Sequence, residues 1–142
     1  MFKIKDKVQI DGDIRIRSTM FKVGDIVRVN NKHEEREILS IYQATDGRIF
    51  CGLGGFLRHF EASELHLIRP STIHHPYTLG QHVYYRRGQS IEDECIIIGI
   101  ERASGYDNVP HLRYNIYYPW TDTVVHMVRR EKLRPLESYT LF

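Results

Sequence analysis

Aromatic side chains are concentrated in the second half of the chain, where they could hold a positively charged or peptide ligand. The relevant residues are Tyr84, Tyr85, Tyr114, Tyr117, Tyr118 and Trp120. A cation bound over aromatic faces beside a carboxylate such as Asp122 would use side chains of this kind. The alternative is that the tyrosines fill the core and cover the outside of the strands. The candidate partner-binding residues are Tyr85, Tyr118, Trp120 and Asp122.

Basic side chains in the same half could instead contact phosphate groups. The candidates are Arg86, Arg87, Arg113, Arg129, Arg130 and Lys132. They would bind a nucleic-acid backbone while Trp120 and Tyr118 stack on bases. Solvated surface charge is the simpler interpretation, because the acidic run 92–94 cancels much of the field. The net charge is only +2, and the excess lies in residues 1–20, with five basic and three acidic residues.

Histidine and cysteine residues do not form a metal-binding or catalytic pattern. The chain has eight histidines, but none has the spacing of a zinc site. Cys51 and Cys95 lie within apolar, strand-like segments, so we expect two reduced core thiols and no disulfide. The glycine-rich run 52–55 continues into a strand, which excludes a phosphate-binding loop before a helix. We therefore expect a protein that is not an enzyme and has no metal or cofactor.

A repeated strand pattern must position these residues. In segments 21–29 and 77–85 an aromatic residue is followed by Gly three positions later and by Val six positions later. A weaker copy at 2–10 has Lys5 in the glycine position. The later parts of the two main copies also agree, because Phe60 precedes Leu65 and Val128 precedes Leu133 by five residues. The sequence therefore predicts two similar units.

Within each unit, alternating apolar residues between turn signals predict short strands. In the first unit the expected strands are 21–29, 36–43, 48–53 and 56–60, followed by a 3₁₀ turn and a short last strand. In the second they are 81–86, 94–101, 113–118, 123–128 and a last strand from 133, with a long loop at 102–111. Asp11 and Gly12 lie between alternating runs and predict an amino-terminal hairpin.

Short strands separated by a turn every 8 to 12 residues are typical of small closed barrels. The sequence predicts an all-β protein with two tandem five-stranded barrels. We expect a hairpin at 1–20, barrels at 21–70 and 77–136, a linker at 71–76 and a tail at 137–142. No apolar run approaches the roughly 18 residues of a membrane span, and no secretory signal opens the chain. We expect an intracellular protein, located in the cytoplasm or in a nucleus.

Each unit has an aromatic residue, then Gly, then Asp or Gln and a β-branched strand, and the second unit ends on Leu133-Arg134-Pro135. This pattern resembles the SH3-like small barrels. It resembles the Tudor, Agenet and KOW branch in particular, and the second unit is most similar to Tudor. The likeness covers about 115 of the 142 residues. In the first unit the Gly54-Gly55 turn departs from the Tudor pattern because it lacks aromatic residues.

Proteins of this kind bind methylated Lys or Arg tails, proline-rich peptides, RNA polymerase, ribosomal RNA or DNA. The resemblance therefore implies a binding module. We expect a non-catalytic adaptor that binds a protein or peptide partner mainly through the second barrel. The alternative is a KOW-like nucleic-acid-binding protein that acts in a transcription, phage or other nucleoprotein assembly.

Overall fold

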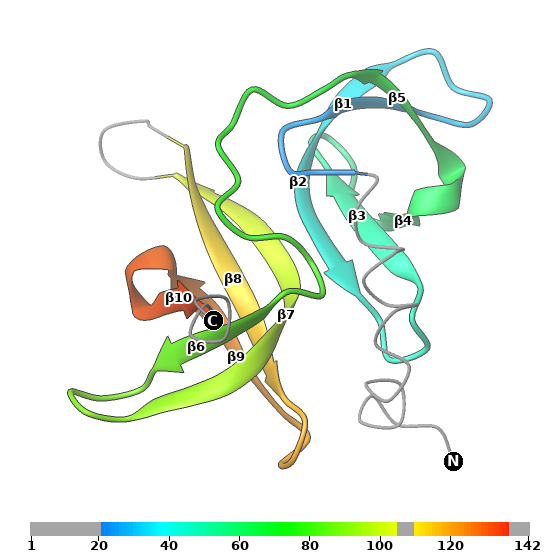
Figure 1. Cartoon of the computed structure of the whole chain (residues 1–142). Helices are drawn as coiled ribbons and strands as arrows, with labels where there is room; N and C mark the ends of the chain where they lie inside the picture. Colours follow the sequence, from blue (N-terminus) through cyan, green and yellow to red (C-terminus); the bar gives the residue numbers. More distant parts are fainter. Residues whose placement is uncertain (1–20, 105–109, 137–142) are drawn as a thin grey trace, which may run out of the picture.

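The computed structural model describes residues 21–104 and 110–136 (Figure 1). The hairpin predicted at 1–20 and the tail at 137–142 lie outside the described residues. Within the described ranges there is no α-helix, and every strand pair is antiparallel. The prediction of an all-β protein is confirmed.

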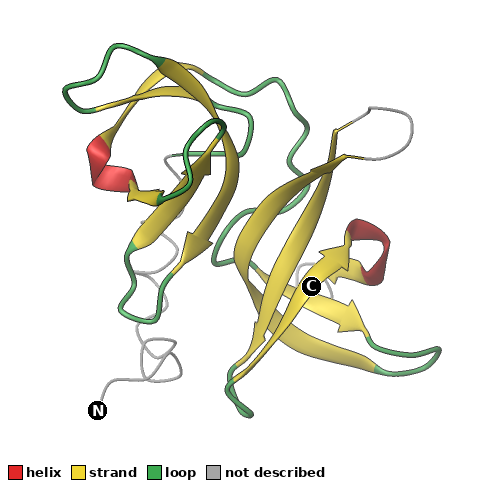
Figure 2. Ribbon diagram, turned by 180° about the vertical axis from the view of Figure 1, so that it is seen from behind, coloured by secondary structure: helices red, strands yellow, loops and turns green. Residues whose placement is uncertain are grey.

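The first half of the described chain consists of five short strands and one 3₁₀ turn. They are β1 (Ile26–Val29), β2 (Glu35–Gln43), β3 (Ile49–Leu53), β4 (His59–Glu61), η1 (Ala62–Glu64) and β5 (Leu65–Arg69). Strand β1 pairs with β2 and with β5, and β3 lies between β2 and β4. The first strand therefore has neighbours on both sides, and the sheet curls around its own apolar face (Figure 2).

The second half repeats this order of pairing. Its elements are β6 (His82–Arg86), β7 (Glu92–Ser104), β8 (Pro110–Tyr118), β9 (Thr123–Arg129), η2 (Arg130–Lys132) and β10 (Leu133–Pro135). Strand β6 pairs with β7 and β10, and β8 lies between β7 and β9. In both halves a single 3₁₀ turn leads into the last strand, which confirms the 3₁₀ turn expected in the first half and shows a second one at Arg130–Lys132.

Several strand boundaries differ from those expected. The first strand begins at Ile26 instead of Phe21, because Lys22 and Asp25 close a turn through the Asp25 N–H and the Lys22 carbonyl, 3.0 Å apart. Strand β4 covers only His59–Glu61, since residues 54–58 form turns. Strands β7 and β8 extend into the predicted loop 102–111, where each continues to pair with the other.

The repeated glycine lies in the same turn in both halves. Gly24 and Gly80 have φ angles of 95° and 81°, a backbone region that residues other than glycine rarely adopt. The Gly24 N–H donates to the Ile38 carbonyl at 2.8 Å, and the Gly80 N–H donates to the Ile97 carbonyl at 2.7 Å. The similarity seen in the sequence is therefore a similarity of backbone geometry.

The residue after each glycine closes this turn with its side chain. An Asp25 carboxylate oxygen accepts the Lys22 N–H at 2.9 Å, and the Gln81 side-chain oxygen accepts the Thr78 N–H at 3.1 Å. Asp25 has a second carboxylate oxygen, which accepts the Ser71 N–H at 2.6 Å. The first turn therefore also holds the start of the segment that joins the two halves.

The two halves share one sheet and one core. Strand β2 pairs with β7 through Ser40 and Glu101, Ile41 and Ile100, and Tyr42 and Gly99 (Figure 1). Buried apolar residues from both halves belong to a single packed cluster. A connection of this kind between the two units was not expected from the sequence.

Candidate partner-binding site

The site lies toward one end of the second half, where two loops connect neighbouring strands. Residues 87–91 connect β6 to β7, and residues 119–122 connect β8 to β9. Because β6, β7, β8 and β9 are successive antiparallel neighbours, both loops lie at the same end of the sheet (Figure 1). At this end Tyr85 and Tyr118 are partly buried and pack against the core.

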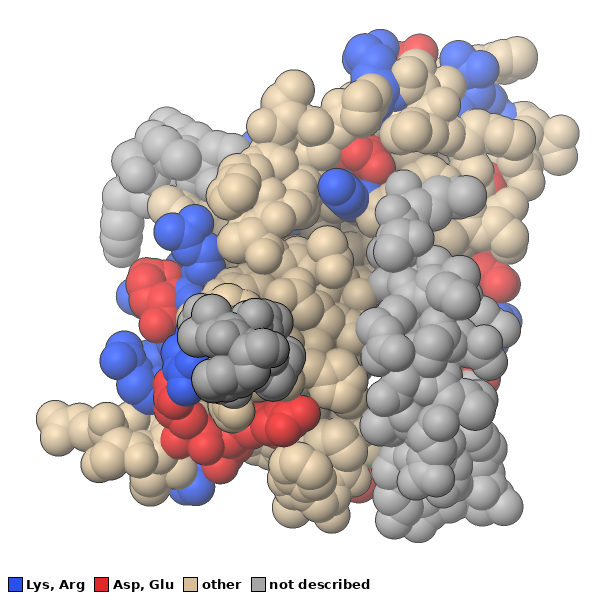
Figure 3. Space-filling view, viewed as in Figure 1, with Lys and Arg blue, Asp and Glu red and all other residues tan. Residues whose placement is uncertain are grey.

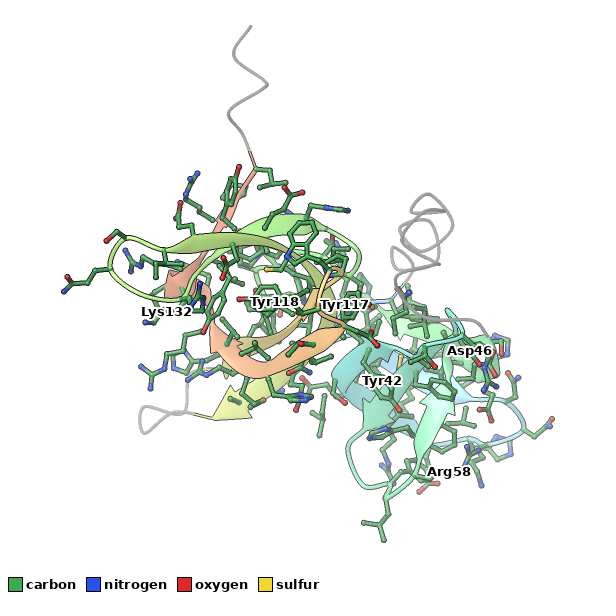
Figure 4. The ribbon with its side chains drawn as sticks, turned by 90° about the horizontal axis from the view of Figure 1, so that it is seen from below. Tyr42, Asp46, Arg58, Tyr117, Tyr118 and Lys132 are labelled. Carbon is green, nitrogen blue, oxygen red and sulfur yellow. The ribbon has the colours of Figure 1, made fainter. Side chains whose placement is uncertain are left out.

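Four of these side chains, Tyr85, Arg87, Asp93 and Tyr118, are here called the mouth cluster. Asp93 Oδ2 accepts hydrogen bonds from Arg87 Nε at 2.9 Å and from the Tyr118 hydroxyl at 3.2 Å. Tyr85 lies opposite Asp93 in the β6–β7 register. Figure 4 shows Tyr118 inside the ring of strands of the second half. The structure therefore brings together the candidates Tyr85 and Tyr118.

The charge state of the mouth cluster follows from its contacts. The hydrogen bond from Arg87 lowers the pKa of the Asp93 carboxyl below its usual value. Burial, followed by the negative charge of Asp93, raises the pKa of the Tyr118 hydroxyl. Near neutral pH the carboxylate is ionised and Tyr118 remains a hydrogen-bond donor.

Trp120 lies in the loop directly beyond Tyr118 and is 70% exposed. Ile91, at the end of the neighbouring loop, is 45% exposed. Each residue is two positions from a partner in the Tyr118–Asp93 hydrogen bond. Two large apolar side chains therefore project from the same end of the sheet that carries the mouth cluster.

Asp122 has a structural contact in this loop. Its Oδ1 accepts the Tyr117 hydroxyl at 2.8 Å, and its N–H donates to the Tyr118 carbonyl at 2.9 Å. Its φ of 54° places it in the left-handed region, which aspartate tolerates better than most residues. The carboxylate proposed for a ligand is therefore engaged in fixing the turn that presents Trp120.

Asp93 is the carboxylate that lies beside Tyr85 and Tyr118, and the sequence analysis did not single it out. It belongs to the acidic run 92–94, which we interpreted only as charge that offsets nearby arginines. The signal that could have identified it is alternation, because Asp93 precedes the buried Cys95 by two residues on the same strand and shares its face. Ile91 was missed because it is an isolated apolar residue in a polar loop.

The six candidate phosphate-binding residues separate into different environments. Arg87 is held by Asp93, and Arg86 lies opposite Glu92 in the β6–β7 register. Arg113 lies opposite Arg129 on β8 and β9, and Arg130 and Lys132 follow in η2. Acidic and basic side chains are intermixed over the β6 and β10 side of this half (Figure 3).

In the first half two half-buried aromatic residues, Tyr42 and Phe50, contact each other. Tyr42 stacks on Phe50 with ring centroids 5.7 Å apart, and its hydroxyl shares a hydrogen bond of 3.0 Å with His59 Nδ1. The Arg48 guanidinium lies 5.2 Å from the centre of the Phe50 ring. The loop equivalent to the Trp120 loop carries Leu57, which is fully exposed.

Metal-binding and thiol groups add no second site in the described part. No group of three or more His, Cys, Asp or Glu side chains within 21–104 and 110–136 could hold a metal ion. Cys51 and Cys95 are free and fully buried, as expected for core thiols. Burial raises the pKa of each thiol to about 12.

These raised pKa values predict that both cysteines resist modification in the folded protein. At pH 8 a thiol with a pKa of about 12 is ionised in only about one molecule in ten thousand. A chromogenic disulfide reagent should therefore modify neither thiol in native buffer, and both in denaturant. Rapid release of the chromophore from the native protein would show that one of the strands carrying them opens readily.

No helix in the described residues is long and apolar enough to cross a membrane. Comparison with known proteins assigns no family, because no family model, curated protein or solved structure matches the chain. Its function must therefore be inferred from its own geometry.

Proposed function

We propose that the chain is a non-catalytic binding protein of two tandem SH3-like barrels, and that it binds a protein or peptide partner mainly through the second. The repeated order of strand pairing supports the fold type, since in each half the first strand pairs with both the second and the last. The 3₁₀ turn before the last strand of each half also supports this fold type.

The observation that carries the binding proposal is the exposure of Trp120 at 70%. A large aromatic side chain contributes much apolar area to an interface, and tryptophan is among the residues that most often dominate binding energy. The turn fixed by Asp122 presents this side chain, and Ile91 is a second exposed apolar residue in the loop 87–91. A partner that covers Trp120 would remove it from water.

The mouth cluster supplies the polar part of this surface. Both hydrogen bonds to Asp93 from described residues end on Oδ2. Its Oδ1 is therefore an acceptor for a donor group of the partner, such as a backbone N–H or a basic side chain. An apolar anchor beside a small number of polar groups is the usual composition of a protein interface.

Trp120→Ala should weaken partner binding by roughly 2 kcal/mol or more, because truncating an interface tryptophan removes a large buried contact. It should change the free energy of unfolding by less than about 1 kcal/mol, since surface substitutions rarely cost more. Capture of the partner from a nuclease-treated lysate of the source cells and thermal unfolding, measured on one preparation, test both expectations.

Leu57→Ala is the matched control, because Leu57 is also exposed and lies in the equivalent loop of the first half. It should capture as much partner as the unmodified chain. Equal capture by the Trp120 and Leu57 variants would refute the placement of the surface. Loss of capture after nuclease treatment of the unmodified chain would refute a protein partner.

A further inference from the structure

Most arginines of the described residues are neutralised by a neighbouring carboxylate. Ion pairs within 4.0 Å involve Arg28, Arg36, Arg48, Arg58, Arg69, Arg87, Arg102 and Arg134. In the second half, five basic side chains have no such partner among the residues described: Arg86, on β6, and Arg113, Arg129, Arg130 and Lys132. The last four are here called the basic face.

The basic face is compact in the fold. Arg113 and Arg129 are directly opposite each other in the β8–β9 register, and the next residues form η2, which contains Arg130 and Lys132. The flanking residues Tyr114 and Val128 are also register partners and are buried in the core. Since side chains alternate along a strand, the two arginines share the outer side of the sheet.

Charges of the same sign directly opposite each other in a sheet are destabilising. Two carboxylates lie nearby, but neither forms an ion pair with the basic face. Glu101 is opposite Arg113 in the β7–β8 register, and its Oε2 accepts a hydrogen bond of 3.0 Å from Asn115 Nδ2. Glu131 lies in η2 between Arg130 and Lys132. Glu101 offsets part of the repulsion at Arg113, but no described carboxylate forms an ion pair within 4.0 Å with Arg113 or Arg129.

We propose that the basic face binds the phosphodiester backbone of a nucleic acid. Guanidinium groups match phosphate oxygens in charge and in geometry, and several neighbouring cations contact successive phosphates. An anion between Arg113 and Arg129 would relieve their repulsion.

A phosphate ligand fits this surface better than a protein does. Protein interfaces centre on aromatic and apolar anchors, and exposed anchors of that kind occur at the mouth end, as Trp120 and Ile91. Of the large apolar side chains on β9, only Met127 is exposed near the basic face. This inference does not depend on the partner surface at the mouth end.

The test is the salt dependence of binding to labelled 30-nucleotide probes, a DNA duplex and a single-stranded RNA, measured by fluorescence anisotropy. Four phosphate contacts predict a log–log slope of about −3.6 for duplex DNA and about −2.8 for a single strand. Duplex affinity should fall on the order of a hundredfold between 50 and 200 mM salt. Binding to either probe alone identifies the source of the phosphodiester, and failure to bind either at 50 mM salt overturns the proposal.

Arg113→Gln combined with Arg129→Gln should reduce the magnitude of the slope by about 2, because each lost phosphate contact removes about one unit. Lys132→Gln should reduce it by about 1. Because Lys132 is exposed in a short turn, its substitution tests the proposal even if the double variant folds poorly. Unchanged slopes in folded variants would contradict the assignment.

Arg48→Gln combined with Arg69→Gln is the matched control. It changes the net charge equally, but both of these arginines are exposed and already paired with carboxylates. The control and Trp120→Ala should both retain the wild-type slope. A control slope reduced as much as that of the double variant would show that only net charge matters. A polyglutamate peptide that binds as tightly as the nucleic acids would assign the face to acidic proteins and overturn the proposal.

Discussion

Ile41→Ala should lower the free energy of unfolding by about 2 to 5 kcal/mol, which is the range for truncating a buried isoleucine. Ile41 is 1% exposed, and it pairs with Cys51 in its own half and with Ile100 in the other. It also lines a pocket of about 190 Å³ between the halves, which the truncation would enlarge. Because the core is shared, both halves should lose stability together.

Calorimetry and hydrogen exchange resolved by peptide can test this expectation. The unmodified chain and the variant should each show one cooperative transition, with faster exchange in β3 and in β8 of the variant. Leu39→Ala is the control, since Leu39 is exposed on the same strand. Two separate transitions, with only the first half affected, would show that the pairing of β2 with β7 contributes little.

Gly24→Val should be similarly damaging, for a different reason. The φ of 95° strains any β-branched residue, at a cost of about 1 to 3 kcal/mol. A Cβ at this position would also lie 2.3 Å from Ser71 Oγ and 2.8 Å from Ile73 Cδ1. Overpacking of this kind costs about 1 to 3 kcal/mol more. Ser71 cannot move away freely, because its Oγ accepts the Ile73 N–H at 3.0 Å and its own N–H is held by Asp25 at 2.6 Å.

Denaturant unfolding of three glycine variants separates these contributions. Gly80→Val should incur the cost of strain, since Gly80 has a φ of 81°. Gly88→Ala is the control, because a Cβ there would meet no atom within 4 Å. The expected order of destabilisation is Gly24→Val, then Gly80→Val, then Gly88→Ala. A Gly24→Val variant as stable as the control would contradict the role assigned to this turn.

The strands could be predicted from the sequence because the information for them is local. Alternation places Val83, Cys95 and Ile97 inward, and the two equivalent glycines mark equivalent turns. Strand ends were less accurate, because turns such as the one at Lys22 and Asp25 depend on side-chain hydrogen bonds that alternation does not encode.

The pairing of β2 with β7 could not be predicted in this way. A strand edge carries the same backbone donors and acceptors wherever it lies, so the local pattern does not reveal its partner. The same limit applies to the mouth cluster. Its aromatic members could be named from composition, but the choice of Asp93 over Asp122 depends on which carboxylate the fold brings beside Tyr118.

The pairing of β2 with β7 also has a consequence for synthesis of the chain on the ribosome. Ser40 pairs with Glu101, a separation in sequence of 61 residues (101 minus 40). The first half can close its own pairings long before β7 emerges. The edge of β2 that later pairs with β7, at Ser40, Ile41 and Tyr42, then has no neighbouring strand, although β3 pairs with the other edge. An unpaired edge that carries apolar residues can add a strand from another molecule. The nascent chain is therefore most prone to aggregation after β5 has been made and before Glu101 emerges, and formation of the β2–β7 pairs ends that period.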